Sequence, residues 1–333
     1  MPRREAPRFV PGMIVPRPRL LLAETDGFTP EVMASLPEWA DVRLGPVPRG
    51  EIGRALRDFE IVWIRLGHRV RAGDISPNGR CRILTVPATG LDHIDLEACA
   101  QAGIRVVSLK GEIDFLRTVT ATAEHTIALA LALIRKVPAA HASVLEGRWD
   151  RDAFRGRELH GRPAGIIGLG RLGNIVAGYL RAFGMKVYAF DPRRDFAETV
   201  AIRCATLEEL FAASDLVTVH VVYDSRTHHM IKAQHLACAR PGAVLINTSR
   251  GGIVDQAALL SALENGTLGG AALDVIEGEP NVGRDHPLVA YARKHENLVL
   301  TPHVGGNTRD SLAKSEAFIA AKTRRTWNEV VHA

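Results

Sequence analysis

The feature that most constrains the fold of this chain is a glycine motif at residues 168–173, which follows an apolar run. Its glycines, Gly168, Gly170 and Gly173, are spaced G-x-G-x-x-G, and an amphipathic stretch comes after them. The pattern predicts a strand, a tight turn and a helix. The first glycine permits the turn, the second lets a pyrophosphate approach the backbone, and the third lets helix and strand pack closely. The N-terminus of that helix attracts phosphate through its free N–H groups and its dipole.

The context of the motif makes a weak signal specific. Three glycines at this spacing also occur in plain glycine-rich turns, so the motif alone decides little. Here a second apolar run, residues 186–190, ends in Asp191, about 20 residues after the motif, where a ribose-binding acid belongs. We therefore predict a Rossmann dinucleotide site at residues 164–191.

Length and composition set the class of protein. A chain of 333 residues predicts two domains. With 46% hydrophobic and 24% charged residues, the composition is that of a globular protein and excludes a disordered one. The net charge of +5 is compatible with nucleic-acid binding, but the basic residues are scattered and no aromatic-interleaved basic patch is present. We expect no nucleic-acid partner.

The cysteines and the apolar runs indicate a location. The four cysteines contain no C-x-x-C pair, which is typical of reduced thiols in a cytosolic protein, and we expect no metal ligands. The longest apolar run, residues 126–134, is too short to span a bilayer. The N-terminal residues lack the apolar core of a signal peptide. We expect a cytoplasmic protein with no membrane partner.

Short apolar runs alternate with helical patterns along the chain, which predicts parallel sheets covered by helices on both faces. Residues 1–18, rich in proline and arginine, are expected to form a surface arm. A first series predicts strands at 20–22, 42–44, 61–64, 83–86 and 104–107, with helices at 30–36 and 52–59. After a long apolar helix at 116–137, a second series predicts strands at 164–167, 186–190, 216–220, 243–247, 270–274 and 298–301, and helices at 207–213, 256–264 and from 307 onward. The fold class is therefore α/β, with two parallel-sheet domains.

Five further segments carry recognisable patterns: residues 89–95 (TGLDHID), 123–125 (AEH), 247–252 (NTSRGG), 274–275 with 279–280 (DV and EP), and 302–306 (PHVGG). Together with the glycine motif, and in this order over residues 60–310, they resemble the D-isomer-specific 2-hydroxyacid dehydrogenases. That family includes 3-phosphoglycerate dehydrogenase and glyoxylate/hydroxypyruvate reductase.

The resemblance implies a domain organisation. Residues 1–113 with 304–333 correspond to a discontinuous substrate-binding domain, and residues 114–303 to the NAD-binding Rossmann domain. Both are Rossmann-like or flavodoxin-like, and the site is expected in the cleft between them. The family commonly forms homodimers through the nucleotide domain, so the apolar helix at 118–135 is expected to lie partly in that interface.

Three residues carry the expected chemistry. Arg250 follows a strand at the carboxyl edge of a sheet, and arginine holds a carboxylate in bidentate fashion. His303 follows the last strand, and histidine passes protons near neutral pH. Glu279 is able to pair with it and fix its tautomer. The residues alone also fit a solvated arginine, a loop histidine and a turn glutamate. The resemblance implies that Arg250 binds substrate, His303 is the acid/base and Glu279 orients it.

The resemblance also implies a cofactor site, because the hydride chemistry belongs to the nicotinamide. NAD is expected to be held by Gly168, Gly170, Arg171, Leu172, Gly173, Asp191, His220, Thr248 and Asp274, the last at the carboxamide of the ring. Asp191 favours NAD over NADP, since its charge repels a 2′-phosphate. Arg193 and Arg194 argue the other way, because an arginine nearby is able to bind that phosphate.

The expected substrate contacts lie in the first domain and in the segment after it. Arg65 matches a basic position of the family, and the backbone N–H groups of Thr89 and Gly90 match its carboxylate-binding turn. Two features depart from the family: Leu66 replaces a common serine, and residues 108–117 form a longer segment. In that segment Lys110 and Arg117 form either an ordinary charged surface or a contact to a second anionic group such as phosphate.

The leading hypothesis is an NAD-dependent oxidoreductase that acts on a D-2-hydroxy acid or 2-oxo acid, either plain or phosphorylated as in 3-phosphoglycerate. A second is an NAD-sensing binding protein on the same scaffold, as in a corepressor of animals. A third is a dehydrogenase of formate or phosphonate-like substrates. Glu279 disfavours the formate enzymes, which carry glutamine there.

Overall fold

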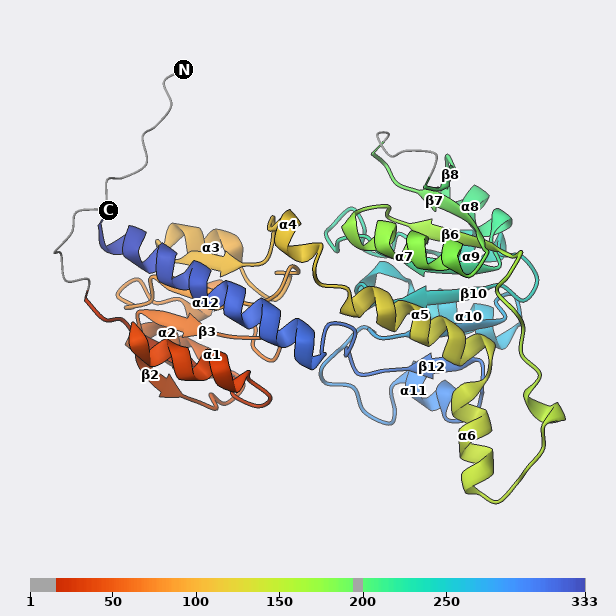
Figure 1. Ribbon diagram of the computed structural model, residues 1–333, viewed down its shortest axis with the longest axis horizontal. Helices are drawn as coiled ribbons and strands as arrows, with labels where there is room; N and C mark the ends of the chain where they lie inside the picture. Colours follow the sequence, from red (N-terminus) through yellow and green to blue (C-terminus); the bar gives the residue numbers. More distant parts are fainter. Residues whose placement is uncertain (1–15, 194–199, 333) are drawn as a thin grey trace. The chain divides into compact units, whose positions relative to one another are not determined.

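The computed structural model describes residues 16–193 and 200–332 (Figure 1). The chain splits into two compact units, and each is described by itself. Unit 1 is Met1–Gly111 with Ala313–Ala333, and unit 2 is Glu112–Leu312. Unit 1 is therefore built from both ends of the chain, whereas unit 2 is continuous.

Unit 1 is a five-stranded parallel sheet with the strand order β2-β1-β3-β4-β5, which is the flavodoxin-like order. Its strands are β1 (Arg19–Leu22), β2 (Asp41–Leu44), β3 (Ile61–Trp63), β4 (Ile83–Val86) and β5 (Arg105–Ser108). Its helices are α1 (Pro30–Ser35), α2 (Ile52–Asp58), α3 (Leu96–Gln101) and most of α12 (Arg309–Val331), with short 3₁₀ turns at Leu36–Glu38 and Ala72–Asp74. The order reverses between β1 and β3, so the loops after these two strands meet at one edge of the sheet.

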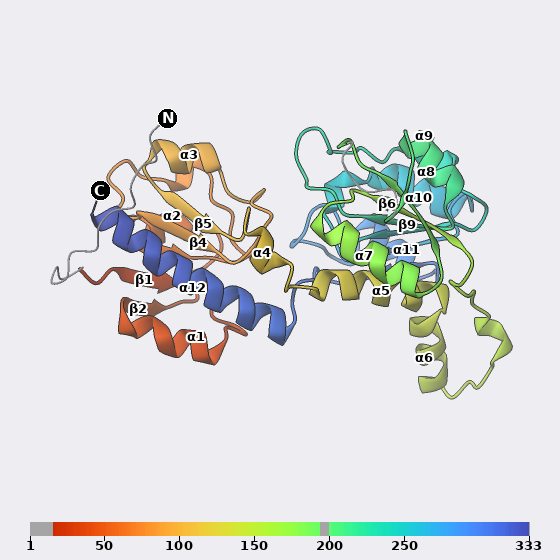
Figure 2. The ribbon, with the colours of Figure 1, turned by 45° about the horizontal axis from the view of Figure 1, so that its top comes forward.

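Alternation along the strands places helices on both faces of this sheet. Leu21, Val62 and Leu84 pack with residues of α2 and α3 in one core cluster. The opposite face lies under α12, where the hydroxyls of Thr85 and Thr323 are 3.1 Å apart and both residues are fully buried (Figure 2).

Unit 2 is a seven-stranded parallel sheet with the order β12-β11-β10-β9-β6-β7-β8. Read from β8, this is the Rossmann order 3-2-1-4-5-6 with one strand added. The strands are β6 (Pro163–Ile167), β7 (Lys186–Phe190), β8 (Ile202–Arg203), β9 (Leu216–Val219), β10 (Val244–Asn247), β11 (Gly270–Leu273) and β12 (Leu298–Leu300). The order reverses between β6 and β9, so the predicted nucleotide turn lies at the switch point, where such sheets bind ligands.

The helices of unit 2 are α4 (Ile113–Leu116), α5 (Ala121–Ile134), α6 (Val137–Leu145), α7 (Arg171–Ala182), α8 (Leu207–Ala213), α9 (Ala233–Ala237), α10 (Gln256–Glu264) and α11 (Pro287–Ala292), with 3₁₀ turns at Asp152–Phe154 and Gly251–Ile253. Among them, α5 and α7 cover one face of the sheet, and α8 and α10 cover the other. One core cluster joins α5 and α7 to Ile166 and Ile246, and another joins α8 and α10 to Val217 and Leu245.

The prediction of one helix over residues 116–137 is wrong. The chain forms α4 and α5, with a break at 117–120, and α6 begins at Val137. Lys136 has a left-handed φ of 54°, and the ring of Pro138 stands at the start of α6, so the helical hydrogen-bond ladder is interrupted. The short elements α3, α9, α11 and β8 were not predicted, because so few residues show no clear period.

Within residues 16–193 and 200–332, no single helix has both the length and the apolar character needed to cross a membrane. One bent pair, 113–134 with 137–145, meets the test of length and composition jointly, at a bend of 61°.

Candidate active site

The glycine turn has the sterics that the motif predicts. Gly168 has φ +91°, and a Cβ there would lie 2.9 Å from the backbone of His220. A Cβ on Gly173 would lie 2.1 Å from the carbonyl oxygen of Gly168, so helix α7 touches the turn directly. At Gly170, the N-cap of α7, the nearest atom to such a Cβ is Nη2 of Arg193, 3.7 Å away. The first and third glycines are thus required by close contacts, and the second faces space that a pyrophosphate is able to enter.

Asp191 is a fixed and ionised carboxylate beside this turn. It is only 7% exposed, and its Oδ2 accepts a hydrogen bond from the backbone N–H of Leu169 at 2.8 Å. Arg193 donates to it from its backbone N–H at 2.9 Å and from Nη2 at 2.9 Å. Burial by itself raises the pKa of Asp191, but the bonds from Arg193 and Leu169 outweigh it and lower the pKa. Arg194 lies outside the described residues.

His220 follows β9 at the switch point. Both of its ring nitrogens are buried, and neither has a hydrogen-bond partner in the described part of the chain. Burial lowers the pKa of His220 to about 3, so the ring is neutral at pH 7. An unpaired buried imidazole is costly unless a ligand completes its bonds, which fits the predicted cofactor contact.

This imidazole predicts a pH dependence of stability. The pKa of His220 is about 3 in the folded chain and about 6.5 in the unfolded chain. The unfolded state therefore binds more protons between these pH values, and acid favours it. From pH 7 to pH 5 we expect this group to lower the free energy of unfolding by about 2 kcal/mol. Urea unfolding at both pH values measures this loss of stability. We expect the loss to be absent in His220→Gln and to remain in His141→Gln, a control at an exposed histidine. An unchanged pH dependence in His220→Gln contradicts the prediction.

Two of the predicted cofactor side chains are bonded within unit 2. Nη1 of Arg171 donates to the carbonyl oxygens of Leu116 and Val119 at 2.8 and 2.9 Å, and burial lowers the pKa of its guanidinium. The hydroxyl of Thr248 is buried 2.9 Å from that of Thr126 in α5. Leu172 lies half-buried in the first turn of α7. These side chains hold α4, α5 and α7 in place. Arg171 and Leu172 are available to an anion through the backbone of the first turn of α7.

His303 and Glu279 form the expected pair. Nδ1 of His303 lies 3.0 Å from Oε1 of Glu279, and both side chains are roughly one-quarter exposed, at 27% and 28%. The histidine follows β12 and has a left-handed φ of 56°. Because Nδ1 is engaged, Nε2 is the nitrogen available to a substrate.

A buried carboxylate holds the loop that carries His303. Asp274, 1% exposed, accepts hydrogen bonds from the N–H groups of Val304 at 2.9 Å and Gly305 at 2.7 Å, and from the hydroxyl of Thr301 at 2.6 Å. Its own carbonyl oxygen accepts from the N–H of His303 at 2.8 Å. These contacts attach residues 301–305 to unit 2, whereas the resemblance implied a domain boundary at 304. The sequence predicts Asp274 as a cofactor contact, and its anchoring of this loop becomes visible only in the fold.

His125 of the AEH motif belongs to the same network. Its Nε2 lies 3.2 Å from Oδ1 of Asp274 and 3.1 Å from the hydroxyl of Thr301. The motif pointed to this position, but only the fold shows that α5 brings it to the end of β11.

Arg250 lies at the same sheet edge as His303. It comes three residues after the end of β10, and β11 separates β10 from β12. Nη1 of Arg250 donates to the carbonyl oxygen of Ser249 at 2.8 Å, and its own carbonyl oxygen accepts from Asn247 at 2.9 Å. Parallel strands end at one edge, so Arg250, Asp274 and His303 follow three adjacent strands there.

The predicted substrate residues of unit 1 differ in their surroundings. Within residues 16–193 and 200–332, the N–H groups of Thr89 and Gly90, after β4, have no protein partner. The guanidinium of Arg65 is held by Glu316 and by the carbonyl oxygen of Asp26, and it lies 5.3 Å from the ring centroid of Phe28.

The two basic residues of the longer segment are exposed. Lys110 is exposed just after β5, in unit 1. Arg117 follows α4 in unit 2 and pairs with Asp114 at 3.3 Å, with both side chains largely in solvent. An exposed ion pair of this kind contributes little to stability, so the pairing with Asp114 does not prevent Arg117 from binding an anion.

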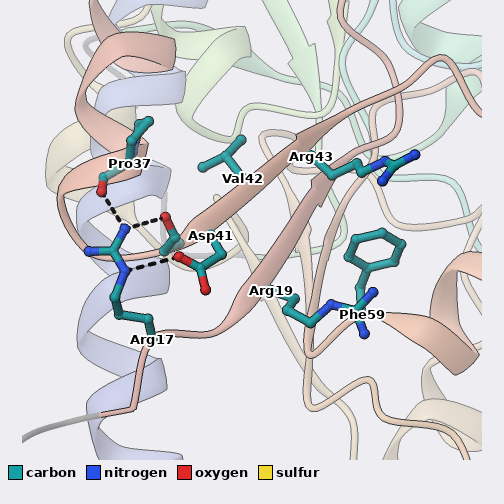
Figure 3. A pocket seen from close by; sticks show the side chains of 8 residues that line it. Arg17, Arg19, Pro37, Asp41, Val42, Arg43 and Phe59 are labelled. Carbon is teal, nitrogen blue, oxygen red and sulfur yellow. Dashed lines mark hydrogen bonds and ion pairs between the residues drawn. The ribbon is translucent and has the colours of Figure 1, made fainter.

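Two cavities lie away from these residues. One of about 480 Å³ in unit 1 is lined by Arg17, Arg19, Arg43 and Phe59, and Arg17 is turned toward Asp41 and Pro37 (Figure 3). The other, of about 760 Å³ in unit 2, is lined by residues that include Leu133, Arg157 and Tyr291. No predicted site residue lines either of them.

Comparison with known proteins gives relatives of one kind. Residues 127–305 match a family model described as the NAD binding domain of D-isomer specific 2-hydroxyacid dehydrogenase. D-3-phosphoglycerate dehydrogenase of Archaeoglobus fulgidus is 39% identical over 282 residues, which are 84% of this chain and 51% of that protein. The Bacillus subtilis D-3-phosphoglycerate dehydrogenase is 36% identical over 77% of this chain and 47% of its own length. This chain thus spans about half the length of these curated relatives.

A solved structure agrees with these relatives. The D-lactate dehydrogenase from Aquifex aeolicus, complexed with NAD and lactic acid, superposes with a TM-score of 0.78 at 28% identity, over 92% of this chain and 94% of that one.

Proposed function

Because this chain belongs to the D-isomer-specific 2-hydroxyacid dehydrogenase family, we propose that it transfers a hydride between NAD and a D-2-hydroxy acid or its 2-oxo counterpart. The observation that carries the proposal is the His303–Glu279 pair, which lies at the carboxyl edge of the same sheet as the nucleotide turn. A dinucleotide turn and an acid/base pair on one edge are what a dehydrogenase of this kind needs.

Each residue has one task in this proposal. NAD, when bound, accepts or supplies the hydride. His303 gives a proton from Nε2 to the carbonyl oxygen during reduction and removes it during oxidation, while Glu279 holds Nδ1. Arg250 binds the substrate carboxylate with its planar fork. In unit 1, the N–H groups of Thr89 and Gly90, which have no protein partner among the described residues, are likewise able to bind a carboxylate.

The relatives favour a phosphorylated substrate of the 3-phosphoglycerate type. Lys110 and Arg117 are the proposed contacts for its phosphate, lysine as a point charge and arginine as a fork.

The test is turnover of 2-oxo and 2-hydroxy acids, phosphorylated and plain, with NADH or NAD. Faster turnover of the phosphorylated acids supports the proposal. NAD binding without turnover of any acid supports a sensing protein instead.

We expect NAD to be preferred over NADP by about tenfold or more in kcat/KM, since one charge-assisted hydrogen bond contributes roughly 1.5–3 kcal/mol. The reason is the buried, ionised carboxylate of Asp191, which accepts bonds from ribose hydroxyls and repels a 2′-phosphate. Steady-state kinetics with both cofactors measure the ratio, and Asp191→Ser is expected to reduce it. Equal efficiency with NADP in the wild type would mean that Arg193 binds the phosphate and that the assignment is wrong.

The homodimer is proposed on the surface around α6. This helix and the segment after it extend away from the sheet of unit 2 (Figure 1). They present large apolar side chains to solvent, above all Leu145 at 74% and Trp149 at 88% exposure. Exposed apolar groups of this size gathered on one segment mark an interaction surface.

Light scattering after size exclusion tests this surface. We expect the wild type at twice the chain mass of 36.2 kDa and Leu145→Asp and Trp149→Asp at the mass of one chain, because a buried unpaired carboxylate is costly. Val222→Asp, at a side chain of similar exposure, 75%, in the loop after β9, is the control and remains dimeric. Dimers in both α6-region variants would place the interface elsewhere.

A cytoplasmic location is proposed from the thiols. All four cysteines are free, and three of them are buried. Burial raises the pKa of Cys81 to about 12 and those of Cys99 and Cys204 to about 11. Such thiols are inert, and unpaired cysteines are typical of a reducing compartment.

A further inference from the structure

Three potential metal ligands meet on two loops at the carboxyl edge of the unit 2 sheet. His228 and His229 lie in the loop after β9, and Glu277 lies in the loop after β11. One ligand atom from each lies within 4.8 Å of the other two, and Nε2 of His229 is 2.6 Å from Oε1 of Glu277. No metal ligand was expected from the sequence, in which Glu277 lies 48 positions after His229.

The backbone around His229 is held in an uncommon conformation. His229 has φ +46°, a left-handed value that non-glycine residues rarely adopt. Its N–H donates to the carbonyl oxygen of Gly252 at 2.7 Å, which fixes the loop to the segment after Arg250. A Cβ on Gly251 would lie 2.5 Å from the backbone nitrogen of Glu277, so that segment also touches the second loop. Residues 251–252 thus bring the two loops together, and strain of this kind gathers at functional sites.

The donor set has the chemistry of a zinc-type site. Nδ1 of His228 lies 3.0 Å from the hydroxyl of Tyr223, which orients the ring and leaves Nε2 as a ligand. The rings of His228 and His229 are stacked with centroids 4.0 Å apart, so one ring has to turn on its side-chain torsions before both nitrogens face one ion. Two imidazole nitrogens and one carboxylate, with a further position open to water, are a known ligand set for Zn²⁺. The side chains of His229 and Glu277 are 34% and 40% exposed, so an ion has access from solvent.

We propose that His228, His229 and Glu277 form a binding site for a divalent transition-metal ion of the zinc class. The ion takes the place of the hydrogen bond between Nε2 of His229 and Glu277, and the ring proton moves to Nδ1, so that His229 binds as a neutral imidazole. Tyr223 acts as the partner that orients His228. Because Glu277 precedes Glu279 by two residues, the ion would connect the loop of His228 to the loop that holds the partner of His303. Metal binding at this site requires neither NAD nor substrate, so its test is independent of the proposed activity.

Titration calorimetry with zinc chloride on the full chain, first freed of metal by a chelator, tests the proposal. We expect one ion per chain in the wild type and at least a tenfold weaker affinity in His228→Ala, His229→Asn and Glu277→Gln. Asparagine tolerates the left-handed backbone of His229, and glutamine keeps a hydrogen bond to it. Tyr223→Phe is expected to weaken binding by about 10–100-fold through the orientation of His228.

Two controls and one spectrum make the outcome decisive. His141→Ala, at an exposed histidine of α6, and Cys238→Ser, at a partly exposed thiol, are expected to bind as the wild type does. Cobalt(II) at the site is expected to show visible absorption bands that the three ligand variants lose. If His229→Asn fails to fold, His228→Ala and Glu277→Gln decide the question. No binding in the wild type, undiminished binding in these variants, or loss of binding in Cys238→Ser overturns the proposal.

Discussion

Alanine in place of His303 is expected to lower kcat by about 10²–10⁴-fold, the range for loss of a general acid–base group. The reason is that His303 combines a carboxylate partner at Nδ1 with an Nε2 that is available to the substrate in the proposed mechanism. Single-turnover reduction of a 2-oxo acid with NADH measures the chemical step directly. The affinity for NADH is expected to change little, because the nucleotide turn is formed by other strands.

The matched control lies at the other end of the same strand. His295 precedes β12 and stacks on Tyr291 with ring centroids 4.0 Å apart, whereas His303 follows β12. His295→Ala is expected to retain the wild-type single-turnover rate. A His303→Ala enzyme with an undiminished chemical step would remove this residue from the mechanism.

Lysine in place of Arg250 is expected both to raise KM and to lower kcat. Lysine keeps the charge but loses the planar fork that matches a carboxylate, and one lost charge-assisted bond corresponds to roughly 1.5–3 kcal/mol, or about 10–150-fold in kcat/KM. Arg240→Lys is the control, since Arg240 pairs with Asp215 at 3.2 Å, on the surface of the same unit. A kcat/KM of Arg250→Lys near that of the wild type would mean that the substrate carboxylate is held elsewhere, with the turn at Thr89 and Gly90 as the first place to search.

Local patterns predicted the parts of the fold that local chemistry decides. The helix predicted at 207–213 is α8, and in the structure the hydroxyl of its N-cap Thr206 accepts the N–H of Glu209 at 3.1 Å. The glycine motif predicted its turn, because the required φ values and contacts involve residues only a few positions apart. The single helix predicted at 116–137 was wrong, because apolar composition does not reveal that Lys136 adopts a left-handed backbone conformation.

Contacts between distant residues explain what the sequence analysis did not predict. Arg65 pairs with Glu316, a residue of α12 that lies 251 positions further along the chain. The oxygens of Asp274 hold a loop that begins 27 positions later. A motif identifies such a residue as important, but only the assembled sheet shows which atoms it meets. The roles of His125, His228 and Glu277 are of the same kind.

The division of unit 1 between the two ends of the chain has a consequence for its synthesis. A ribosome releases the five strands of unit 1 before unit 2, but α12 only after it. Until then one face of that sheet lacks Ile319, Thr323 and Trp327, which are buried in the complete chain, and Arg65 lacks its carboxylate partner. Unit 2 is continuous and has every strand it needs earlier. Unit 2 is thus able to fold before unit 1 is complete, and the nascent sheet of unit 1 is the part of this chain that most needs protection from aggregation.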